Sequence, residues 1–373
     1  MNRLVLIGNG FDLAHGLKTN YADFINWYWE EWGRRLMTSG KKSESDEFCR
    51  FILNKELGLG AWYLVRGCYF QDISLDAKNF IERAKKDREL CEFLYNDAFF
   101  DRINNSIETK KWVDLEDEYY NLLLELLGVN ATKKIWLQPK ALNDDLVSLK
   151  HKLIDYLRFV NKTKTAVIED IREKIYRPIK EGEIAVADKK LFEAEEKHEP
   201  SNIMLLNFNY TTTPERYMEG HSNVTINYIH GHMNAPQSVI FGYGDELDEN
   251  YKRLKEQNDI ECMRHVKSIR YQEHDNYRRM LEFIESVPFQ VVIMGHSCGN
   301  SDRTLLNTIF EHPNCVSIKP YYYQIDDKTD NYSELTISIN RNFSDPKLMR
   351  DRVVCKDFCE PLTGVKPGVK VLG

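Results

Sequence analysis

Short apolar runs that end in glycine, asparagine or another polar residue occur at both ends of the chain. The first covers residues 2–8, and the others come after residue 201: "NIMLLNFNY", "VTINYIHG", "SVIFGYG", "FQVVIMGHS" and "CVSIKPYYYQID". Runs of this length predict buried β-strands. Helical patterns such as "RTLLNTIFEH" separate several of them, and strands that alternate with helices predict a parallel sheet with crossover connections. We therefore expect residues 2–8 to join the sheet that is built after residue 201.

The segment between these parts has a different pattern. Residues 36–200 are rich in Lys, Glu, Leu and Tyr, and stretches such as "WVDLEDEYYNLLLELL" have apolar positions at helical spacing. Another helix is expected to begin near Tyr21, where aromatic residues recur at close to 3.6-residue spacing. The predicted fold class is thus α/β, a Rossmann-like parallel sheet interrupted by a large α-helical insertion. The predicted domains are a split α/β domain over 1–35 and 201–373, and a helical insertion domain over 36–200.

Composition narrows the function classes. Hydrophobic residues make up 42% of the 373 residues and charged residues 29%, as in ordinary soluble globular proteins. Apolar runs such as "VVIMG" are far shorter than the ~20 residues that span a bilayer, and we see no signal-peptide pattern. We therefore expect a cytoplasmic protein without a membrane partner. The net charge of −7 disfavours nucleic acid as a partner, and the charged stretch at 252–279 is interpreted as a solvated helix face.

Metal binding is not expected. The eight cysteines are scattered and are expected to be reduced thiols. Cys355 and Cys359 lack a second nearby pair, which a structural zinc site would need.

The stretch "LIGNGFDLAHGL" joins a predicted strand to a predicted helix through glycines. Small residues let the backbone approach a phosphate, and amide groups at a helix N-terminus favour anions. The candidate nucleotide-contacting residues here are Gly8, Asn9, Gly10, Phe11, Asp12 and Gly16. Their spacing is neither the dehydrogenase G-x-G-x-x-G nor a Walker loop, so a tight turn without a ligand is the alternative.

Two further turns carry candidate polar residues, and ligands gather at the carboxyl ends of parallel strands. Asn207 and Asn209 follow one predicted strand, where their amides can orient ribose hydroxyls or a water. The alternative is that they cap a helix near Pro214. His230 and Gly231 follow the next strand, and an imidazole can move protons near neutral pH, although a lone histidine is more often structural.

The last turn, in "VVIMGHSCGNSDRTLL", supplies Gly295, His296, Ser297 and Asp302. Its G-x-S-x-G outline also fits the nucleophile elbow of α/β-hydrolases, with Ser297 as nucleophile. Such an esterase should have its acid and then its histidine downstream. Only His312 follows, which disfavours this alternative.

The order of these turns resembles the sirtuin-like NAD-binding fold. Gly8, Gly10 and Gly16 match the glycines of that family's G-A-G-x-S-x-x-x-G-I-P loop, with Asn9 for its alanine and Asp12 for its serine.

In the same comparison, Asn209 matches the family's catalytic asparagine and His230-Gly231 its catalytic His-Gly. Gly295-His296-Ser297 matches its late G-x-S loop, while Thr211 stands where an acid is expected. The resemblance implies that Asn209 and His230 are catalytic and that NAD+ is the substrate or ligand.

A closer resemblance is to the AbiH family of bacteriophage abortive-infection proteins, carried by "LIGNGFDLAHGLKTNYADF", "LNFNYT", "IHGH", "FGYGDE" and "GHSCGNSD". Together the two resemblances imply an antiphage effector that binds NAD+ and hydrolyses its nicotinamide–ribose bond. The alternative is a non-catalytic nucleotide-sensing or partner-binding module of a phage defence system. A nucleotide is the expected ligand, and a homo-oligomer and a phage-derived trigger are compatible partners that the sequence does not specify.

Overall fold

The structure is a computed structural model that describes residues 1–39, 43–53, 91–109, 115–128, 138–163, 165–190 and 198–364. The chain divides into two compact units. Unit 1 consists of Met1–Lys18, Val160–Glu256 and His265–Gly373, and unit 2 consists of Thr19–Phe159 and Gln257–Arg264. The domain division that the sequence suggests stays a prediction.

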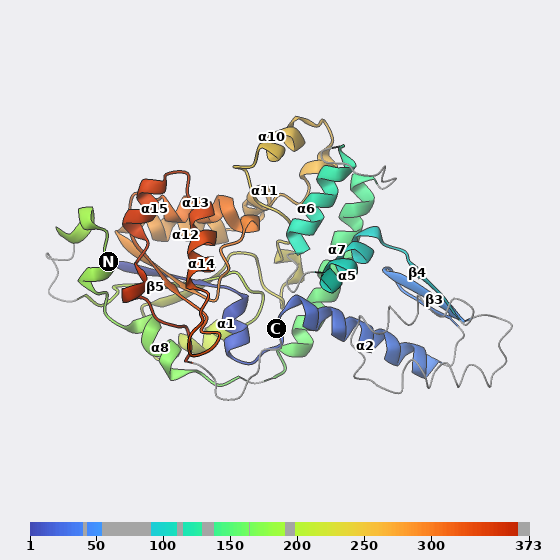
Figure 1. Ribbon diagram of the computed structural model, residues 1–373, viewed down its shortest axis with the longest axis horizontal. Coiled ribbons are helices and arrows are strands. Elements are labelled where there is room, and N and C mark those ends of the chain that lie inside the picture. Colours follow the sequence, from blue (N-terminus) through green and yellow to red (C-terminus); the bar gives the residue numbers. More distant parts are fainter. Residues whose placement is uncertain are drawn as a thin grey trace. The chain divides into compact units, whose positions relative to one another are not determined.

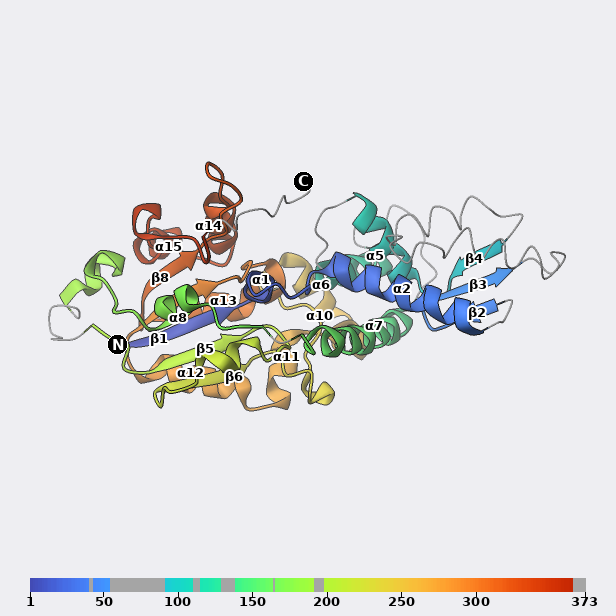
Figure 2. The ribbon, with the colours of Figure 1, turned by 90° about the horizontal axis from the view of Figure 1, so that it is seen from below.

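Unit 1, which contains α1, α12 and α13 in Figure 1, is built on a five-stranded parallel sheet with the strand order β6-β5-β1-β7-β8. Figure 2 labels four of these strands, β6, β5, β1 and β8. The strands are β1 (Asn2–Ile7), β5 (Ile203–Asn207), β6 (Val224–Tyr228), β7 (Phe289–Met294) and β8 (Cys315–Tyr321). The first strand lies at the centre, where Leu4 pairs with Met204 on one side and Val291 on the other. The predicted α/β fold class is therefore confirmed, and so is the pairing of residues 2–8 with the later strands.

Successive side chains of a strand point to opposite faces of the sheet, so a strand that is apolar throughout must be covered on both faces. Helices provide this cover. Leu4 and Leu6 of β1 pack in one core cluster with α12 (Asn276–Ser286), α13 (Arg303–Phe310) and α14 (Tyr332–Arg341). Val5 and Ile7 pack in a second cluster with α1 (Asn9–Ala14) and α8 (Glu169–Tyr176). The apolar run 4–7 of β1 is what a strand with both faces buried requires.

Shorter elements complete unit 1. They are η1 (Glu181–Glu183), η2 (Val186–Asp188), η3 (Thr213–Tyr217), η4 (Pro236–Ser238), α10 (Glu249–Glu256), α11 (Lys267–Arg270), η6 (Tyr271–Glu273), η7 (Asn300–Asp302), α15 (Pro346–Arg352) and η8 (Lys356–Phe358).

Unit 2 contains helices and a small sheet (Figure 2). The helices are α2 (Tyr21–Ser39), α5 (Ala98–Thr109), α6 (Leu115–Leu126), α7 (Pro139–Val160) and η5 (Ile260–Met263). The strands β2 (Ser43–Ser45), β3 (Cys49–Leu53) and β4 (Cys91–Tyr95) form an antiparallel sheet beside α2. The predicted aromatic stripe of α2, at positions 21, 24, 27, 28 and 32, is confirmed at Phe24, Tyr28 and Trp32, which are buried.

The segment 36–200 was expected to be mostly helical. Its described residues contain α5, α6, α7 and α8, and they also contain the small sheet β2-β3-β4, whose strands are too short for a clear alternation. One local prediction was wrong. The run "SVIFGYG" was expected to be a strand, yet its Ser238 ends η4 and the residues after it form a buried loop. Apolar runs report burial, and burial alone does not distinguish a strand from a packed loop.

One further finding concerns membranes. Over the residues that the structure describes, none of the helices has the length and apolar character needed to cross a bilayer.

Candidate functional site

The predicted site residues lie in loops that leave the carboxyl ends of four adjacent strands of unit 1. Gly8 follows β1, and the loop continues into α1 (blue in Figure 1). Asn209 follows β5, His230 follows β6 and His296 follows β7. The parallel sheet thus collects motifs that are separated by up to almost 300 positions in the sequence.

A buried carboxylate lies at the centre of these loops. Asp302 ends η7, and its Oδ1 lies 2.8 Å from Lys267 Nζ and 3.2 Å from His230 Nε2. Its Oδ2 lies 3.4 Å from His296 Nε2. The four side chains expose between 2% and 11% of their surface. The structure therefore brings the predicted residues His230, His296 and Asp302 together and adds Lys267.

The hydrogen bonds indicate which imidazole nitrogens carry protons. His296 Nδ1 accepts a hydrogen bond from the backbone N–H of Cys298 at 3.0 Å, so the ring proton belongs on Nε2, which faces Asp302. An ionised carboxylate only accepts hydrogen bonds. His230 Nε2 lies 3.2 Å from Asp302 Oδ1 and is hydrogen-bonded to the Tyr271 hydroxyl at 3.2 Å, and a proton on Nε2 is the arrangement that avoids placing two acceptors against each other.

Electrostatics hold the carboxylate charged and His230 neutral. Burial opposes ionisation of Asp302, but Lys267 and His230 outweigh it and keep its pKa well below the ordinary value. Burial lowers the pKa of His230, and the nearby Lys267 ammonium lowers it further, although Asp302 acts in the opposite direction. A neutral imidazole at neutral pH can accept a proton.

An aromatic ring packs against both histidines of the site. The ring centroid of Phe208 lies 4.1 Å from that of His296 and 5.2 Å from that of His230. Phe208 follows β5 directly and belongs to the core cluster on one face of the sheet. It was not among the candidates from sequence, because an aromatic residue beside a strand ordinarily signals packing alone.

The two asparagines hold the loops after β1 and β5 together. Asn207 is fully buried, and its Nδ2 donates to the Thr211 carbonyl at 3.1 Å while its Oδ1 accepts from the Asn209 backbone N–H at 3.1 Å. Asn209 Nδ2 donates to the Gly8 carbonyl at 2.9 Å. Neither contact is a helix cap, and η3 begins without a side-chain cap. The amide nitrogen of Asn209 is thus engaged with the chain itself.

The glycines have a structural role that is visible without a ligand. A Cβ on Gly8 would lie 2.5 Å from the His296 Cα, and one on Gly10 would lie 2.8 Å from the Gly295 Cα. Gly295 has a φ of +73°, and the Gly10 backbone N–H donates to its carbonyl at 2.8 Å. Gly16, with a φ of +79°, follows the end of α1. Close packing of two loops therefore explains Gly8, Gly10 and Gly295, and their contact with a phosphate stays a prediction.

Asp12 lies inside unit 1 and not at its surface. It is 1% exposed, and its Oδ2 accepts a hydrogen bond from the Thr211 hydroxyl at 2.6 Å. Burial raises the pKa of Asp12 to about 6, against the opposing effect of the Thr211 hydroxyl. Asp12 stands at the position of the sirtuin-like serine, and Thr211 stands where an acid is expected. The two residues thus contact each other.

Ser297 has no histidine base in the arrangement expected of an esterase. Ser297 is exposed and follows the carboxyl end of β7. The ring of His312 contacts Phe289 at the opposite end of β7, and its Nε2 lies 3.3 Å from Glu285. The length of β7 therefore separates His312 from Ser297.

Lys267 and Tyr271 were missed because the stretch 252–279 was interpreted as a solvated face. That interpretation fails for these two residues, since Lys267 is 2% exposed and Tyr271 5%. Charges of both signs surround them in the sequence, so their burial had no local signal.

Comparison with known protein families decides the classification. The family model described as "Bacteriophage abortive infection AbiH" matches residues 4–323. The chain belongs to the AbiH family. Membership indicates a role in phage abortive infection, and the matched span of this AbiH-family chain includes every loop of the site. A search of curated proteins found no match.

Proposed function

We propose that this AbiH-family protein acts in phage defence by hydrolysing NAD+ at the bond between nicotinamide and ribose. The observation that carries the proposal is a buried histidine, His230, held by an ionised carboxylate at the carboxyl edge of a parallel sheet. Two further features support it. Ligands of open α/β sheets bind at this edge, and the order of the loops resembles the sirtuin-like NAD-binding fold.

The reaction replaces one bond at the ribose. The oxygen of a water attacks the ribose C1′, the C1′–N bond breaks, and its electron pair leaves with neutral nicotinamide. His230 accepts the proton that the water loses. Asn209 orients the water or the ribose hydroxyls through its carbonyl oxygen, because its amide nitrogen donates to Gly8. We expect the loops at Gly8–Asp12 and Gly295–Ser297 to contact the rest of the dinucleotide.

The second candidate is a nucleotide-sensing module without catalysis. The observation that favours it is burial, since His230 is 4% exposed and His296 6% exposed. In that case the same loops bind a nucleotide. The contacts of Asp302 with Lys267 and the two histidines then only stabilise the loops.

The test is nicotinamide release by the purified protein, with and without extract of phage-infected cells. His230→Ala and Asn209→Ala should each lower release by about 10²–10⁴-fold, the range expected for loss of general-base catalysis. The control is His151→Ala, which removes an exposed histidine of unit 2. Melting temperatures of the three variants separate a catalytic loss from a loss of folding.

Undiminished release from folded His230→Ala would remove this residue from the mechanism. If the wild-type protein binds NAD+ but releases no nicotinamide under either condition, the sensing function is correct and hydrolysis is not.

A further inference from the structure

The backbone and side chain of Lys267 pack against the loop that contains Tyr243 and Gly244. The Lys267 backbone N–H donates to the Tyr243 carbonyl at 2.7 Å, and the Tyr243 N–H donates to the His265 carbonyl at 3.1 Å. A Cβ on Gly244 would lie 3.2 Å from the Lys267 Cβ, so the glycine leaves room for the lysine chain. The buried loop that resembled a strand in sequence thus fixes the start of α11.

The environment of the ammonium group indicates its role. A buried ammonium is costly unless it is paired, and Lys267 Nζ is paired with Asp302 Oδ1 at 2.8 Å. The same oxygen lies 3.2 Å from His230 Nε2, and the other oxygen lies 3.4 Å from His296 Nε2. One carboxylate therefore accepts a hydrogen bond from an ammonium and lies within 3.4 Å of two imidazole nitrogens, and an ionised carboxylate can accept from all three while a neutral carboxylic acid cannot.

We propose that Lys267 is a positioning residue of the site: its ammonium keeps Asp302 ionised and aligned, so that Asp302 holds Nε2 of both histidines and His230 presents Nδ1 as the proton acceptor. This inference rests on the proposed function for the substrate, but the arrangement of the protons can be tested without it. It reverses the assignment of nitrogens in the serine-protease triad, where the carboxylate holds Nδ1 and Nε2 is the base.

The arrangement has a consequence for the pKa of His230. The groups that face its ring are Lys267 of α11, Asp302 of η7, His296 after β7 and Tyr271 of η6. Lys267 lowers the pKa of His230, whereas Asp302 raises it. Removal of the ammonium alone should therefore raise the pKa of His230 and let the ring become protonated at a higher pH.

The experiment is an imidazole ¹⁵N NMR titration of the full-length protein, with the His230 signals assigned from a His230→Gln variant. In the wild type His230 should be neutral at neutral pH, with its proton on Nε2. In Lys267→Met the titration midpoint of His230 should rise by about one pH unit, a tenfold tighter hold on the proton. Lys267→Arg should restore the wild-type midpoint. Lys255→Met, at an exposed lysine of α10, is the matched control and should change nothing.

Nicotinamide release provides a second reading. In Lys267→Met the acid limb of the pH profile should move upward with the His230 midpoint, and kcat should fall while KM stays nearly constant. If the NMR shifts occur but no protein, wild type included, releases nicotinamide, the positioning role stands and NAD+ hydrolysis is wrong.

A folded Lys267→Met protein with an unchanged His230 midpoint would overturn the inference. If that variant does not fold, Lys267→Met/Asp302→Leu removes both charges and the acceptor oxygens. His230 should then lose its preference for a proton on Nε2. Retention of the wild-type tautomer in the double variant would show that Asp302 does not hold it.

Discussion

At the scale of single residues, burial decides what each polar group of unit 1 can do. Asp302 is kept ionised because a buried ammonium and an imidazole surround it. Asp12 is equally inside the protein, but the polar side chains that act on its carboxyl group are the neutral hydroxyls of Thr211 and Thr213. The surroundings thus lower the pKa of the Asp302 carboxyl group and raise the pKa of the Asp12 carboxyl group.

Asp12 should make the stability of the protein depend on pH. Its pKa rises from 3.8 to about 6 in the folded state, so the folded protein binds the proton more tightly than the unfolded chain. Its contribution is then most favourable below pH 4 and is lost as the pH rises to 6, which amounts to about 3 kcal/mol. In Asp12→Asn the free energy of unfolding should therefore decline less between pH 4 and pH 7.

The measurement is urea unfolding at a series of pH values, with Asp327→Asn at an exposed loop position as the control. Equal declines in the wild type and in Asp12→Asn would mean that Asp12 ionises normally in the folded protein.

At the scale of elements, the site is made by loops that pack backbone against backbone. The loop after β1 and the loop after β7 approach so closely that Gly8, Gly10 and Gly295 have no room for a Cβ. Two adjacent parallel strands carry these loops, so their separation is set by the sheet. The glycines are therefore needed for the loop geometry whether or not a nucleotide binds.

Substitution of these glycines should destabilise the fold. In Gly10→Val the new side chain meets the Gly295 backbone, and in Gly295→Ala the new Cβ meets the Phe11 backbone nitrogen at 2.1 Å. Overpacking of this kind costs about 1–3 kcal/mol, and the positive φ of Gly295 adds about 1–2 kcal/mol. Both variants should melt at lower temperature than the wild type.

Gly364→Ala is the control, because a Cβ there has no neighbour within 4 Å. Wild-type melting of Gly10→Val would show that the loops can separate without cost. That result would reopen the interpretation of Gly10 as an opening for phosphate.

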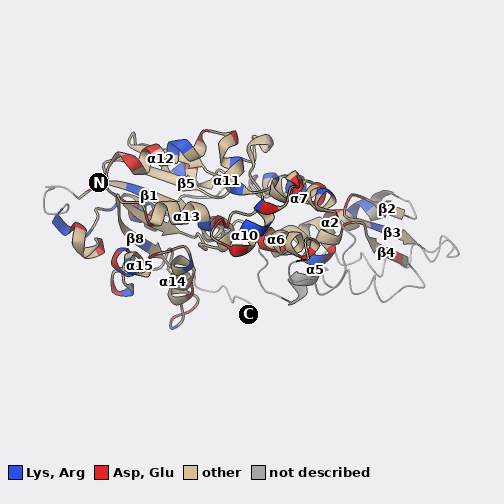
Figure 3. Cartoon of the chain, turned by 90° about the horizontal axis from the view of Figure 1, so that it is seen from above, with Lys and Arg blue, Asp and Glu red and all other residues tan. Residues whose placement is uncertain are grey.

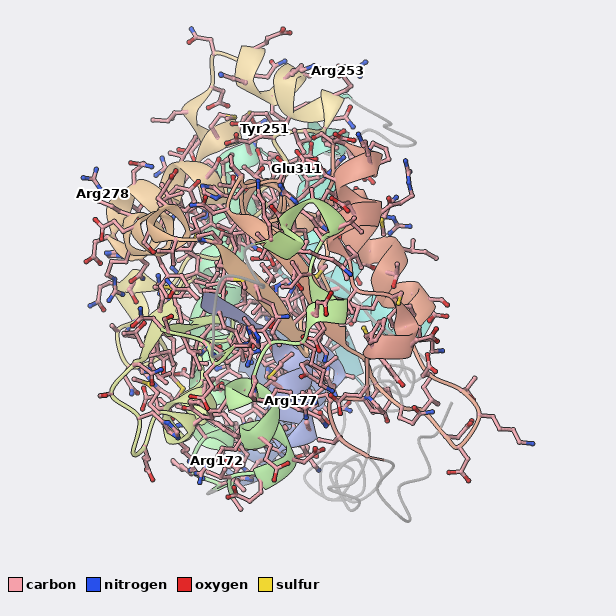
Figure 4. All side chains as sticks on the ribbon, turned by 90° about the vertical axis from the view of Figure 1, so that its left-hand side faces the viewer. Arg172, Arg177, Tyr251, Arg253, Arg278 and Glu311 are labelled. Carbon is pink, nitrogen blue, oxygen red and sulfur yellow. The ribbon has the colours of Figure 1, made fainter. Side chains whose placement is uncertain are left out.

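At the scale of the whole molecule, buried polar groups connect distant segments of unit 1. Glu183 of η1 accepts from Lys319 Nζ at 2.6 Å and from Gln290 Nε2 at 3.0 Å. Arg3 of β1 donates to Gln290 Oε1 and, at 2.8 Å, to the carbonyl of Arg177, which follows α8 and is labelled in Figure 4.

The charges at the surface are of mixed sign. In Figure 3 both signs are interspersed over α7, α10 and α15.

This network of buried polar groups predicts that the free energy of unfolding depends strongly on whether each buried charge keeps its partner. Glu183→Gln leaves the Lys319 ammonium without its carboxylate in a site where both side chains are 2% exposed, which should cost about 3 kcal/mol. Glu183→Gln/Lys319→Met removes both charges and should be more stable than the single variant. Chemical unfolding measures both, with Lys189→Met of the exposed pair Lys189–Glu181 as the control, expected within about 0.5 kcal/mol. A double variant no better than Glu183→Gln would show that shape and not charge matters here.

The sequence by itself determined the parallel sheet, the long helices α2, α6 and α7, and the loops that carry the candidate residues. These features depend on local periodicity, because strand and helix geometry repeat every two and 3.6 residues. Only the tertiary structure decided the rest. The pairing of β3 with β4, the contact between Asp12 and Thr211, and the place of Lys267 beside Asp302 all depend on partners far away in the chain. Burial and charge pairing at such distances leave no periodic signal, so the chemistry of the site emerges only when the sheet brings its loops together.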